Sequence, residues 1–370
     1  MAKPATKKTK SKAKGKAQGE ARGEPAEQES VHGRMKLPSV VVRSYSLELR
    51  DQDGFVGDNA SQTAFRELLD RWRRRRSRRG DDPLGEKPST ELSKDEIDRK
   101  LRSKTDDPAA DIVHGAVEEF SVELAHVIRR HLRQKSWEGV RRIVIGGGFP
   151  ESEVGERVIL QTGTMLHNEG LKVELARLCH EPDDGGLLGW LHLAPPQMLT
   201  GYDAFLAVDI GGTNVRCGIV KPRRARAADL SKAKVVKREK WRHADEDPKQ
   251  KDLLAGIVEM LERNIRRAKK KGLSLAPFIG IACPGLIRED GSIARGAQNL
   301  PGDWERDTFH LPSHVHNKIP AIDGRPTLVM LHNDAVVQGL SELPFMQDVK
   351  RWAVLTIGTG LGNASYQNRG

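Results

Sequence analysis

The sequence predicts an α/β protein with two domains, and three features support this prediction. Its 370 residues are enough for two domains of ordinary size. Short runs of branched apolar residues, typical of buried strands, alternate with segments whose apolar residues recur at helical spacing. Several of the apolar runs end directly in glycine-rich turns. We therefore expect sheets flanked by helices.

The N-terminal half contains three predicted strands and several helices. Residues 141–145 (RRIVI) are a short branched-apolar run, which favours a strand, and the three glycines that follow end it. Between residues 109 and 133, apolar side chains recur at helical spacing. In chain order we expect a strand over 39–49, helices over 60–76 and 109–133, a strand over 141–145, a helical segment to about 170, a strand over 172–178 and a helix over 185–194.

The C-terminal half begins with AFLAVDIGGTN from Ala204, which predicts a buried strand that ends in a turn. The segment from Leu253 to Lys271 has the apolar spacing of an amphipathic helix with a basic end. The other elements that we expect are strands over 215–220, 235–241, 276–285 and 327–334, a helix over 335–343, and two strands around a glycine turn over 353–370.

The net charge of +11 comes mainly from local basic segments. Residues 1–35 form the first, and their lysines, alanines and small polar residues predict a disordered tail. Arg71 to Arg79 (RWRRRRSRR) form the second, at the end of a predicted helix. A solvated tail and a solvated helix end are the favoured interpretation, and contact with a polyanion is the alternative. Trp72 is the only aromatic residue among these arginines, so nucleic-acid binding has little support.

Cysteine use and hydropathy narrow the class of protein further. The three cysteines (Cys179, Cys217 and Cys283) are dispersed in or beside apolar runs, which favours buried free thiols. There is no Cys-x-x-Cys pair, so a cysteine-based zinc site is not expected. No apolar run approaches the ~20 residues that span a membrane, and the basic N-terminus is not followed by a signal-type apolar stretch. We expect a cytoplasmic protein.

Two glycine-rich turns are candidate phosphate-binding motifs. Residues 209–214 read Asp-Ile-Gly-Gly-Thr-Asn, and residues 356–363 read Thr-Ile-Gly-Thr-Gly-Leu-Gly-Asn. Glycines adopt positive φ and let backbone N–H groups approach phosphate oxygens. Thr213 adds a hydroxyl donor, and Asp209 can hold Mg²⁺ directly or through water. An ordinary hairpin explains either turn alone but explains both together poorly, because each closes a branched-apolar strand.

A third candidate site lies where the strand TLVML (327–331) leads into a helix. Asp334, just after this strand, stands at the carboxyl end of an α/β sheet, where ligands bind. A carboxylate there can act as general base toward a substrate hydroxyl. It can also simply cap the helix. Beside two phosphate-binding turns, the interpretation as a base is favoured.

Four motifs in order resemble the ROK (glucokinase-like) sugar kinases of the actin/hexokinase/Hsp70 class. DIGGTNVRCGIV resembles the phosphate-1 motif, GIACPGLIREDGSIARGAQNLPGDW the PG…NLPGW stretch, LHNDAVVQGLSELP the ND…E helix, and VLTIGTGLGNASYQNRG the phosphate-2 hairpin. Each is weak alone, but together they span 204–370 with family spacing. The resemblance implies two ribonuclease H-like (actin-like ATPase) lobes, each a mixed five-stranded sheet flanked by helices.

The N-terminal half resembles the part of the family that normally comes last. VRRIVIGGGFPES (140–152) is similar to the adenosine-motif strand and its GGG turn, and DDGGLLGWLHLA (183–194) to the terminal helix. We interpret this order as a circular permutation; two fragments that pair between chains are the alternative. The predicted division is a tail over 1–35, the family's C-terminal lobe over 36–198 with a charged linker over 80–108, its N-terminal lobe over 199–345, and the phosphate-2 hairpin of the first lobe over 346–370.

The resemblance implies ATP-dependent phosphorylation of a sugar hydroxyl, most directly O6 of a hexose. It assigns Asp334 as catalytic base and Asp209 as the Mg²⁺ ligand. The remaining implied contacts are phosphate contacts from Asp209, Gly211, Gly212, Thr213, Asn214, Gly358, Thr359 and Gly360, adenosine contacts from Gly146, Gly147 and Gly148, and sugar contacts from Gly285, Asn299, Asn333 and Asp334.

The chain also departs from the family. The Glu-x-Gly-His sugar clamp and the Cys/His zinc cluster are missing. We therefore expect no zinc, and the sequence does not specify which sugar is the substrate. His32-Gly33 is not a convincing substitute for the clamp, Glu48 is a stand-in by position only, and Glu342 reads as structural. A sugar- or nucleotide-sensing regulator without turnover, or a kinase that uses polyphosphate as donor, are the alternatives. A homodimer is also left open.

Overall fold

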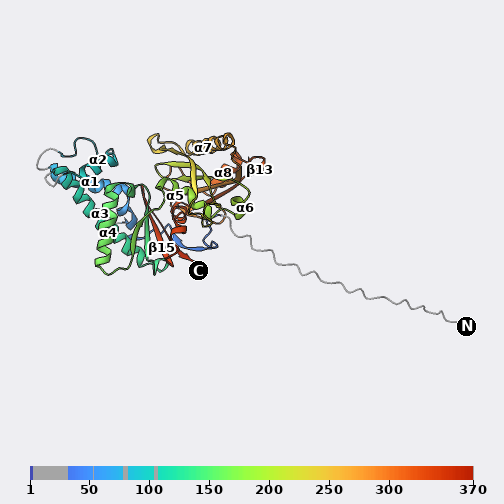
Figure 1. The fold of residues 1–370 in the computed structure, drawn as a ribbon, viewed down its shortest axis with the longest axis horizontal. Coiled ribbons are helices and arrows are strands. Elements are labelled where there is room, and N and C mark those ends of the chain that lie inside the picture. Colours follow the sequence, from blue (N-terminus) through green and yellow to red (C-terminus); the bar gives the residue numbers. More distant parts are fainter. Residues whose placement is uncertain (3–31, 53, 78–81, 104–106, 370) are drawn as a thin grey trace. The chain divides into compact units, whose positions relative to one another are not determined.

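The computed structural model describes residues 1–2, 32–52, 54–77, 82–103 and 107–369. The chain divides into a unit Met1–Ser30 and a unit Val31–Gly370, and every described helix and strand belongs to the second unit (Figure 1). Most of the predicted basic tail lies outside the described residues.

The first five-stranded sheet is built from both ends of this unit. Its strands in spatial order are β1 (Val40–Tyr45), β16 (Leu361–Asn368), β15 (Arg351–Ile357), β4 (Arg142–Gly146) and β5 (Glu174–Arg177). β1, β16 and β15 pair antiparallel, whereas β15, β4 and β5 pair parallel. Val40 lies opposite Asn368 and Tyr45 opposite Ala364. The strand predicted over 39–49 therefore exists and lies beside the last strand of the chain.

The second five-stranded sheet lies in the C-terminal half. Its strands in spatial order are β8 (Lys234–Trp241), β7 (Val215–Lys221), β6 (Ala204–Ile210), β9 (Leu275–Cys283) and β14 (Leu328–Asn333). β8, β7 and β6 pair antiparallel, and β6, β9 and β14 pair parallel.

The two sheets share one topology, which defines the fold as two ribonuclease H-like α/β lobes. Each consists of two antiparallel pairings followed by two parallel ones, with the central strand leading into the glycine hairpin. In the second sheet the central strand is also the first along the chain. In the first sheet, β15, β16 and β1 occupy the places that β6, β7 and β8 occupy in the second sheet. Along the chain, however, β1 comes first, and β15 and β16 come last.

Helices cover both sheets. Four pack on one face of the first sheet: α1 (Gln62–Ser77), α2 (Lys94–Leu101), α3 (Pro108–Leu132) and α4 (Glu153–Asn168). In Figure 1, α3 and α4 lie side by side. Two pack on one face of the second sheet: α7 (Gln250–Lys270) and α8 (Leu311–Lys318). Three lie between the sheets: α5 (Pro182–Leu188), α6 (Pro196–Leu199) and α9 (Asp334–Leu340).

Short elements complete the described part of the chain. The three two-stranded ribbons are β2 (Arg50–Asp51) with β3 (Gly54–Phe55), β10 (Leu286–Ile287) with β11 (Ile293–Arg295), and β12 (Ala321–Ile322) with β13 (Arg325–Pro326). The 3₁₀ turns are η1 (Val56–Ala60), η2 (Lys135–Trp137), η3 (Phe149–Glu151), η4 (Gly189–His192), η5 (His243–Asp245) and η6 (Leu343–Phe345).

Strand alternation explains how two sheets enclose three cores. Because successive strand residues face opposite sides, Ile143 and Ile145 pack under α3 and α4, whereas Val144 faces the other lobe. In the second sheet Leu206 packs under α7, and Phe205 faces the shared core. This shared core, between the sheets, is filled by α5, η4 and α9.

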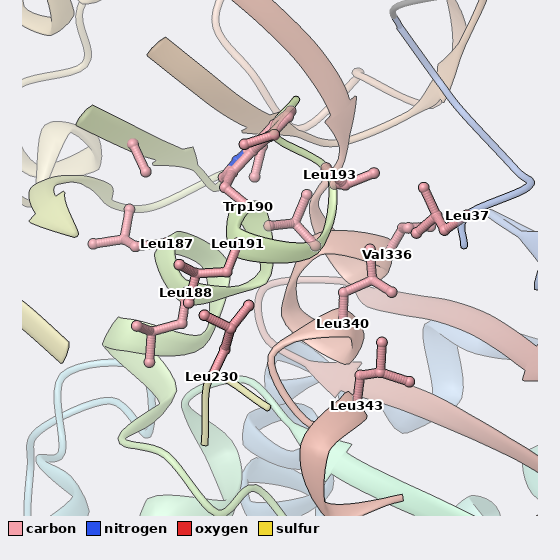
Figure 2. Close-up of a cluster of buried hydrophobic side chains, with 14 of the residues drawn as sticks. Leu37, Leu187, Leu188, Trp190, Leu191, Leu193, Leu230, Val336, Leu340 and Leu343 are labelled. Atoms are coloured by element: carbon pink, nitrogen blue, oxygen red, sulfur yellow. The ribbon is translucent and has the colours of Figure 1, made fainter. Parts of the chain in front are cut away.

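The shared core includes the segment just before the predicted domain boundary at residue 198. Figure 2 shows Leu187, Leu188 and Leu191 from α5 and η4 together with Leu340 from α9. The segment 182–199 contacts β6, β7 and β9 of the second sheet as well as α9, so it belongs to the junction and not to the first lobe alone. The predicted helix over 185–194 begins earlier, at Pro182, and tightens to a 3₁₀ turn after Leu188.

Two predictions about single side chains, those of Arg73 and Cys179, are corrected. Arg73, predicted in a solvated helix end, is 6% exposed because it binds Asp82, Ser89 and the Gly85 carbonyl. Cys179 is exposed, because it follows the end of the edge strand β5, whereas the other two cysteines are buried as predicted. The charged segment predicted as a linker does contain one short helix, α2.

The predicted tail also ends earlier than residue 35. The Gly33 N–H donates to the Leu331 carbonyl at 3.2 Å. The Leu331 N–H donates to His32 Nδ1 at 3.1 Å. Residues 32–35 therefore pack along β14, the edge strand of the second sheet, which offers unpaired backbone groups.

Gly189 tests the packing between the lobes. A Cβ atom there would lie 1.7 Å from the Val337 carbonyl oxygen of α9. Because backbone atoms would have to move, we expect Gly189→Ala to lower the free energy of unfolding by about 2–4 kcal/mol. Gly163→Ala in α4 is the control, since its Cβ would meet only Leu175 at 3.9 Å. Chemical denaturation should show the control unchanged or more stable; equal stability of both variants would contradict the close packing.

Candidate functional site

The two glycine hairpins, one from each sheet, meet. In the β6–β7 hairpin the Gly211 N–H donates to the Asn214 carbonyl at 2.9 Å. In the β15–β16 hairpin the Gly358 N–H donates to the Gly360 carbonyl at 3.0 Å. The hydroxyls of Thr213 and Thr359, one from each hairpin, are hydrogen-bonded at 2.7 Å. Sequences about 146 residues apart thus form one surface.

Neighbouring backbone and side-chain groups hold both hairpins in place. The Gln62 N–H donates to the Gly358 carbonyl at 2.8 Å, and Thr63 Oγ1 donates to the Thr359 carbonyl at 3.0 Å. His243 Nε2 lies 2.8 Å from the Gly211 carbonyl. Asn299 lies against both hairpins, because a Cβ at Gly212 would meet its Cβ at 3.1 Å and a Cβ at Gly360 its Nδ2 at 3.1 Å. Larger residues at either glycine would displace Asn299.

Asp334 lies at the start of α9, where Asn333 has taken the capping role. Asn333 Oδ1 accepts the Val336 N–H at 3.1 Å, as an N-cap does. Asp334 Oδ1 accepts the next N–H, that of Ala335, at 2.8 Å. Burial, and secondly the charge of Asp209, raise the pKa of the Asp334 carboxyl to about 7. A carboxyl with this pKa is suited to exchange a proton near neutral pH.

Asp209 is the second-last residue of β6 and is 8% exposed. Its Oδ2 accepts from Arg216 Nη1 of β7 at 3.2 Å, and Arg216 also contacts Asp183 of α5. Burial raises the pKa of the Asp209 carboxyl, and the Arg216 guanidinium opposes that rise. Gly186 of α5 leaves the space for this carboxylate, because a Cβ there would lie 2.6 Å from Asp209 Cγ. α5 therefore closes over the charged pair.

This region fits a hydrated Mg²⁺ that arrives with a phosphate ligand. The negative charge of Asp209 acts on Asp334, and a divalent cation between them would relieve that repulsion. Asp209 would hold the ion through one oxygen, since Arg216 occupies the other. Among residues 1–2, 32–52, 54–77, 82–103 and 107–369, no cluster of three or more His, Cys, Asp or Glu side chains has metal-binding geometry.

The hairpins and Asp334 line one cavity of about 720 Å³. Its size suits a nucleotide together with a small acceptor. Of the predicted site residues, those that line it are Asp209, Gly211, Gly212, Thr213, Asn214, Gly147, Gly148, Gly285, Asn299, Asn333, Asp334, Gly358, Thr359 and Gly360.

Gly146, predicted as an adenosine contact, is not among the residues that line the cavity. It is the last residue of β4 and is packed against Gln338, whose Oε1 would lie 2.4 Å from a Cβ. Gly147 follows with φ of +81°, and its Cβ would meet the Ile357 carbonyl at 2.4 Å. Its N–H donates to Gln338 Oε1 at 3.1 Å. This turn therefore lies directly beside the β15–β16 hairpin.

Asn333, predicted as a sugar contact, lines the cavity and is also held by neighbouring protein groups. It is 2% exposed, and its Nδ2 donates to the Gly285 carbonyl at 3.0 Å and to Ser46 Oγ at 3.1 Å. With Oδ1 on the helix cap, its amide is occupied by protein groups. The amide ties the β9–β10 turn, where Gly285 has φ of +103°, to the segment after β1.

The other residues singled out in the sequence have separate places. Glu48 lines the cavity but is ion-paired with Arg295 at 2.5 Å. Glu342 is fully buried and accepts the Cys179 N–H with both oxygens, at 3.1 and 3.0 Å, so it is structural as predicted. His32 and Gly33 lie on β14 and not among the lining residues.

Sequence reasoning missed several polar lining residues. Lys94 comes from α2, Lys240 from the end of β8, and Arg242 from just beyond it. Each lies in a charged stretch that resembles a solvated surface, so only the topology brings it to the cavity. Lys240 pairs with Asp183 at 3.0 Å and Arg242 with Asp245 at 2.8 Å.

No helix in the described part of the chain has the length and apolar character to span a bilayer.

Comparison with known proteins gives only distant similarity. No protein-family model matches the sequence, and no curated protein matches it. A protein from Cytophaga hutchinsonii assigned as a sugar kinase is similar at 18% identity and a TM-score of 0.34, over 44% of this chain and 47% of that one. Lmo2764 from Listeria monocytogenes, assigned as an N-acetylmannosamine kinase, is similar at 21% identity and a TM-score of 0.32, over 45% and 47%.

A third structure, an exopolyphosphatase-like protein, is similar at 13% identity and a TM-score of 0.30, over 68% of this chain and 86% of that one. The matched region spans about half the length of each of the first two structures. The fold class is therefore defined by the topology of the two sheets.

The raised pKa of Asp334 makes a prediction about stability. An exposed aspartate titrates near 3.9, and in the folded protein the value is about 7, so the folded state binds the extra proton. Wild-type stability is then fully present below about pH 4 and falls as the pH rises to about 7. Asp334→Asn removes this loss, which amounts to up to about 4 kcal/mol.

We expect the difference in melting temperature between Asp334→Asn and wild type to grow in favour of the variant from pH 4 to pH 8. Asp323→Asn is the control, because Asp323 is exposed in the β12–β13 turn with φ of +48°, which asparagine tolerates. A difference for Asp334→Asn that stays constant with pH would contradict the raised pKa.

Proposed function

We propose that this protein is a sugar kinase that transfers a phosphoryl group from ATP to a hydroxyl of a hexose. The observation that carries the proposal is the contact between Thr213 and Thr359, which joins two glycine hairpins above the same cavity as Asp334. Both hairpins line this cavity, and glycine turns of this kind offer backbone N–H groups to phosphate oxygens. A half-buried carboxyl at the carboxyl end of β14 suits a hydroxyl acceptor.

The roles follow from the geometry. The backbone of Gly211–Thr213 and Gly358–Gly360 would hold the phosphates, and Asp209 would orient the accompanying Mg²⁺, which neutralises phosphate charge. Asp334 would accept the proton of the attacking hydroxyl, O6 of a hexose in the family that the motifs resemble. Asn299, against both hairpins, would contact the sugar. Positioning and charge neutralisation account for most of the rate in phosphoryl transfer.

We also propose that the chain is a circular permutation of the ROK order. Its first lobe uses β15 and β16 as the first two strands and β1 as the third. Joining the end of β16 to the start of β1 would restore the order of the second sheet, because Asn368 and Val40 are opposite each other. Ends that lie close together make such a permutation physically tolerable. This supports a single chain over pairing between two fragments.

A transfer assay with purified protein tests the proposal. It crosses ATP and polyphosphate with a panel of hexoses, for wild type and for Asp334→Asn, with Asp323→Asn as control. We expect wild type to phosphorylate at least one hexose from ATP, with a rate that rises through about pH 7 as Asp334 loses its proton. Asp334→Asn should lose about 10²–10⁴-fold of this rate and keep nucleotide binding.

The outcomes separate the alternatives. Phosphoryl transfer from polyphosphate but not from ATP would identify polyphosphate as the donor. Saturable sugar binding without transfer from either donor would indicate a sensor. Equal turnover of Asp334→Asn and wild type would exclude Asp334 as the base.

A further inference from the structure

The helix α2 brings a lysine to the turn after β4. Along the chain, α2 follows α1 and precedes α3, within the charged segment that was predicted as a linker. Lys94 is its first residue, and its Nζ donates to the Gly148 carbonyl and lies 3.0 Å from Glu151 Oε2. Its side chain is 35% exposed and lines the cavity. An ammonium group therefore stands at the edge of the site.

α2 is fixed in this place by more than surface charge. Ile97 and Leu101 are buried in the core under α3 and α4. Ser93 and Glu96 form a capping box at the start of the helix, with Ser93 Oγ accepting the Glu96 N–H at 3.2 Å. Lys94 is thus held on an ordered helix.

The same helix closes the N-terminal end of α4 to other anions. The Asp98 carboxylate accepts the first two N–H groups of α4, from Glu153 and Val154, both at 3.0 Å. The start of a helix after a glycine turn would otherwise attract a phosphate. Asp98 occupies these donors and adds a negative charge, so the start of α4 does not attract a phosphate. A phosphate at this turn would need a positive charge from another residue. Lys94, which contacts the turn at Gly148, supplies one.

The position of the turn indicates which ligand group Lys94 meets. Gly147 packs on the Ile357 carbonyl, directly before the Gly358–Gly360 hairpin. A phosphate chain held by that hairpin would pass beside Gly147 and Gly148, and Gly148 carries the Lys94 contact. The ammonium group has three donors, and among the described residues its hydrogen-bond partners are Gly148 and Glu151.

We propose that Lys94 of α2 binds a phosphate group of the donor nucleotide, with Asp98 as the residue that positions α2. This rests on the proposed function, because it assumes a nucleotide donor. The site would then contain a cation that does not belong to either glycine hairpin. α2 becomes part of the donor site and not a linker.

Calorimetric titration of the full chain with Mg²⁺-ADP, tripolyphosphate and adenosine tests this. Lys94→Met should weaken ADP and tripolyphosphate about tenfold, the loss of one charge-assisted hydrogen bond, and leave adenosine affinity unchanged. Lys94→Arg should retain most of the ADP affinity. Lys100→Met is the matched control, because Lys100 lies on the same helix, is 41% exposed and does not line the cavity.

Asp98→Asn adds a test of positioning. It should weaken ADP binding in the wild-type background and have no further effect on ADP in the Lys94→Met background, whereas any loss of melting temperature should appear in both backgrounds. Unchanged ADP affinity in a Lys94→Met variant that melts like wild type would overturn the role of Lys94. Wild type that binds neither ADP nor tripolyphosphate would overturn the proposed function as well.

Discussion

The hydrogen bond between Thr213 and Thr359 depends on the packing of the whole protein. Each hydroxyl stands on a hairpin that closes the central antiparallel pair of one sheet, so the 2.7 Å contact requires both sheets to hold a fixed mutual position. That position is set by the shared core, in which α5, η4 and α9 fill the space between the sheets. Small residues are essential there, since Gly189 lets η4 approach α9 at the distance of backbone contact.

Charges in the site follow from the same packing. α9 delivers Asp334 and α5 covers Asp209, and burial raises the pKa of both carboxyls. The Arg216 guanidinium opposes the rise for Asp209, whereas the charge of Asp209 adds to the rise for Asp334, whose pKa reaches about 7. The result is an unequal pair: one acid hydrogen-bonded to an arginine, and one acid that exchanges its proton near neutral pH.

Much of this arrangement could be predicted from the sequence, because short local sequence patterns determine it. The glycine turns at 211–212 and 358–360 follow apolar runs, and such runs predict buried strands that end in phosphate-type hairpins. The strand over 39–49 was predicted from its apolar residues, and the structure pairs it, as β1, with β16. The contacts of Asn333 with Gly285 and Ser46 could not be predicted, because a helix cap and a ligand use the same amide group.

The rest could not be predicted, because it depends on tertiary contacts between charged segments. Nothing in KDEIDRKL marks Lys94 as a cavity residue or Asp98 as a helix cap for α4. Arg73 stands in a run of arginines but is buried, since Asp82 and Ser89 come from a loop that folds back over α1. Gly146, Gly147 and Gly148 form one run in the sequence, yet Gly146 is the last residue of β4 and the other two lie beyond it.

Hydrogen exchange with and without Mg²⁺-ADP tests the central claim most directly, namely that both hairpins hold one phosphate chain. The account predicts that amides at 211–214 and at 358–360 become protected together, at the same nucleotide concentration. Protection of one hairpin alone, or of neither under conditions where ADP binds, would contradict it.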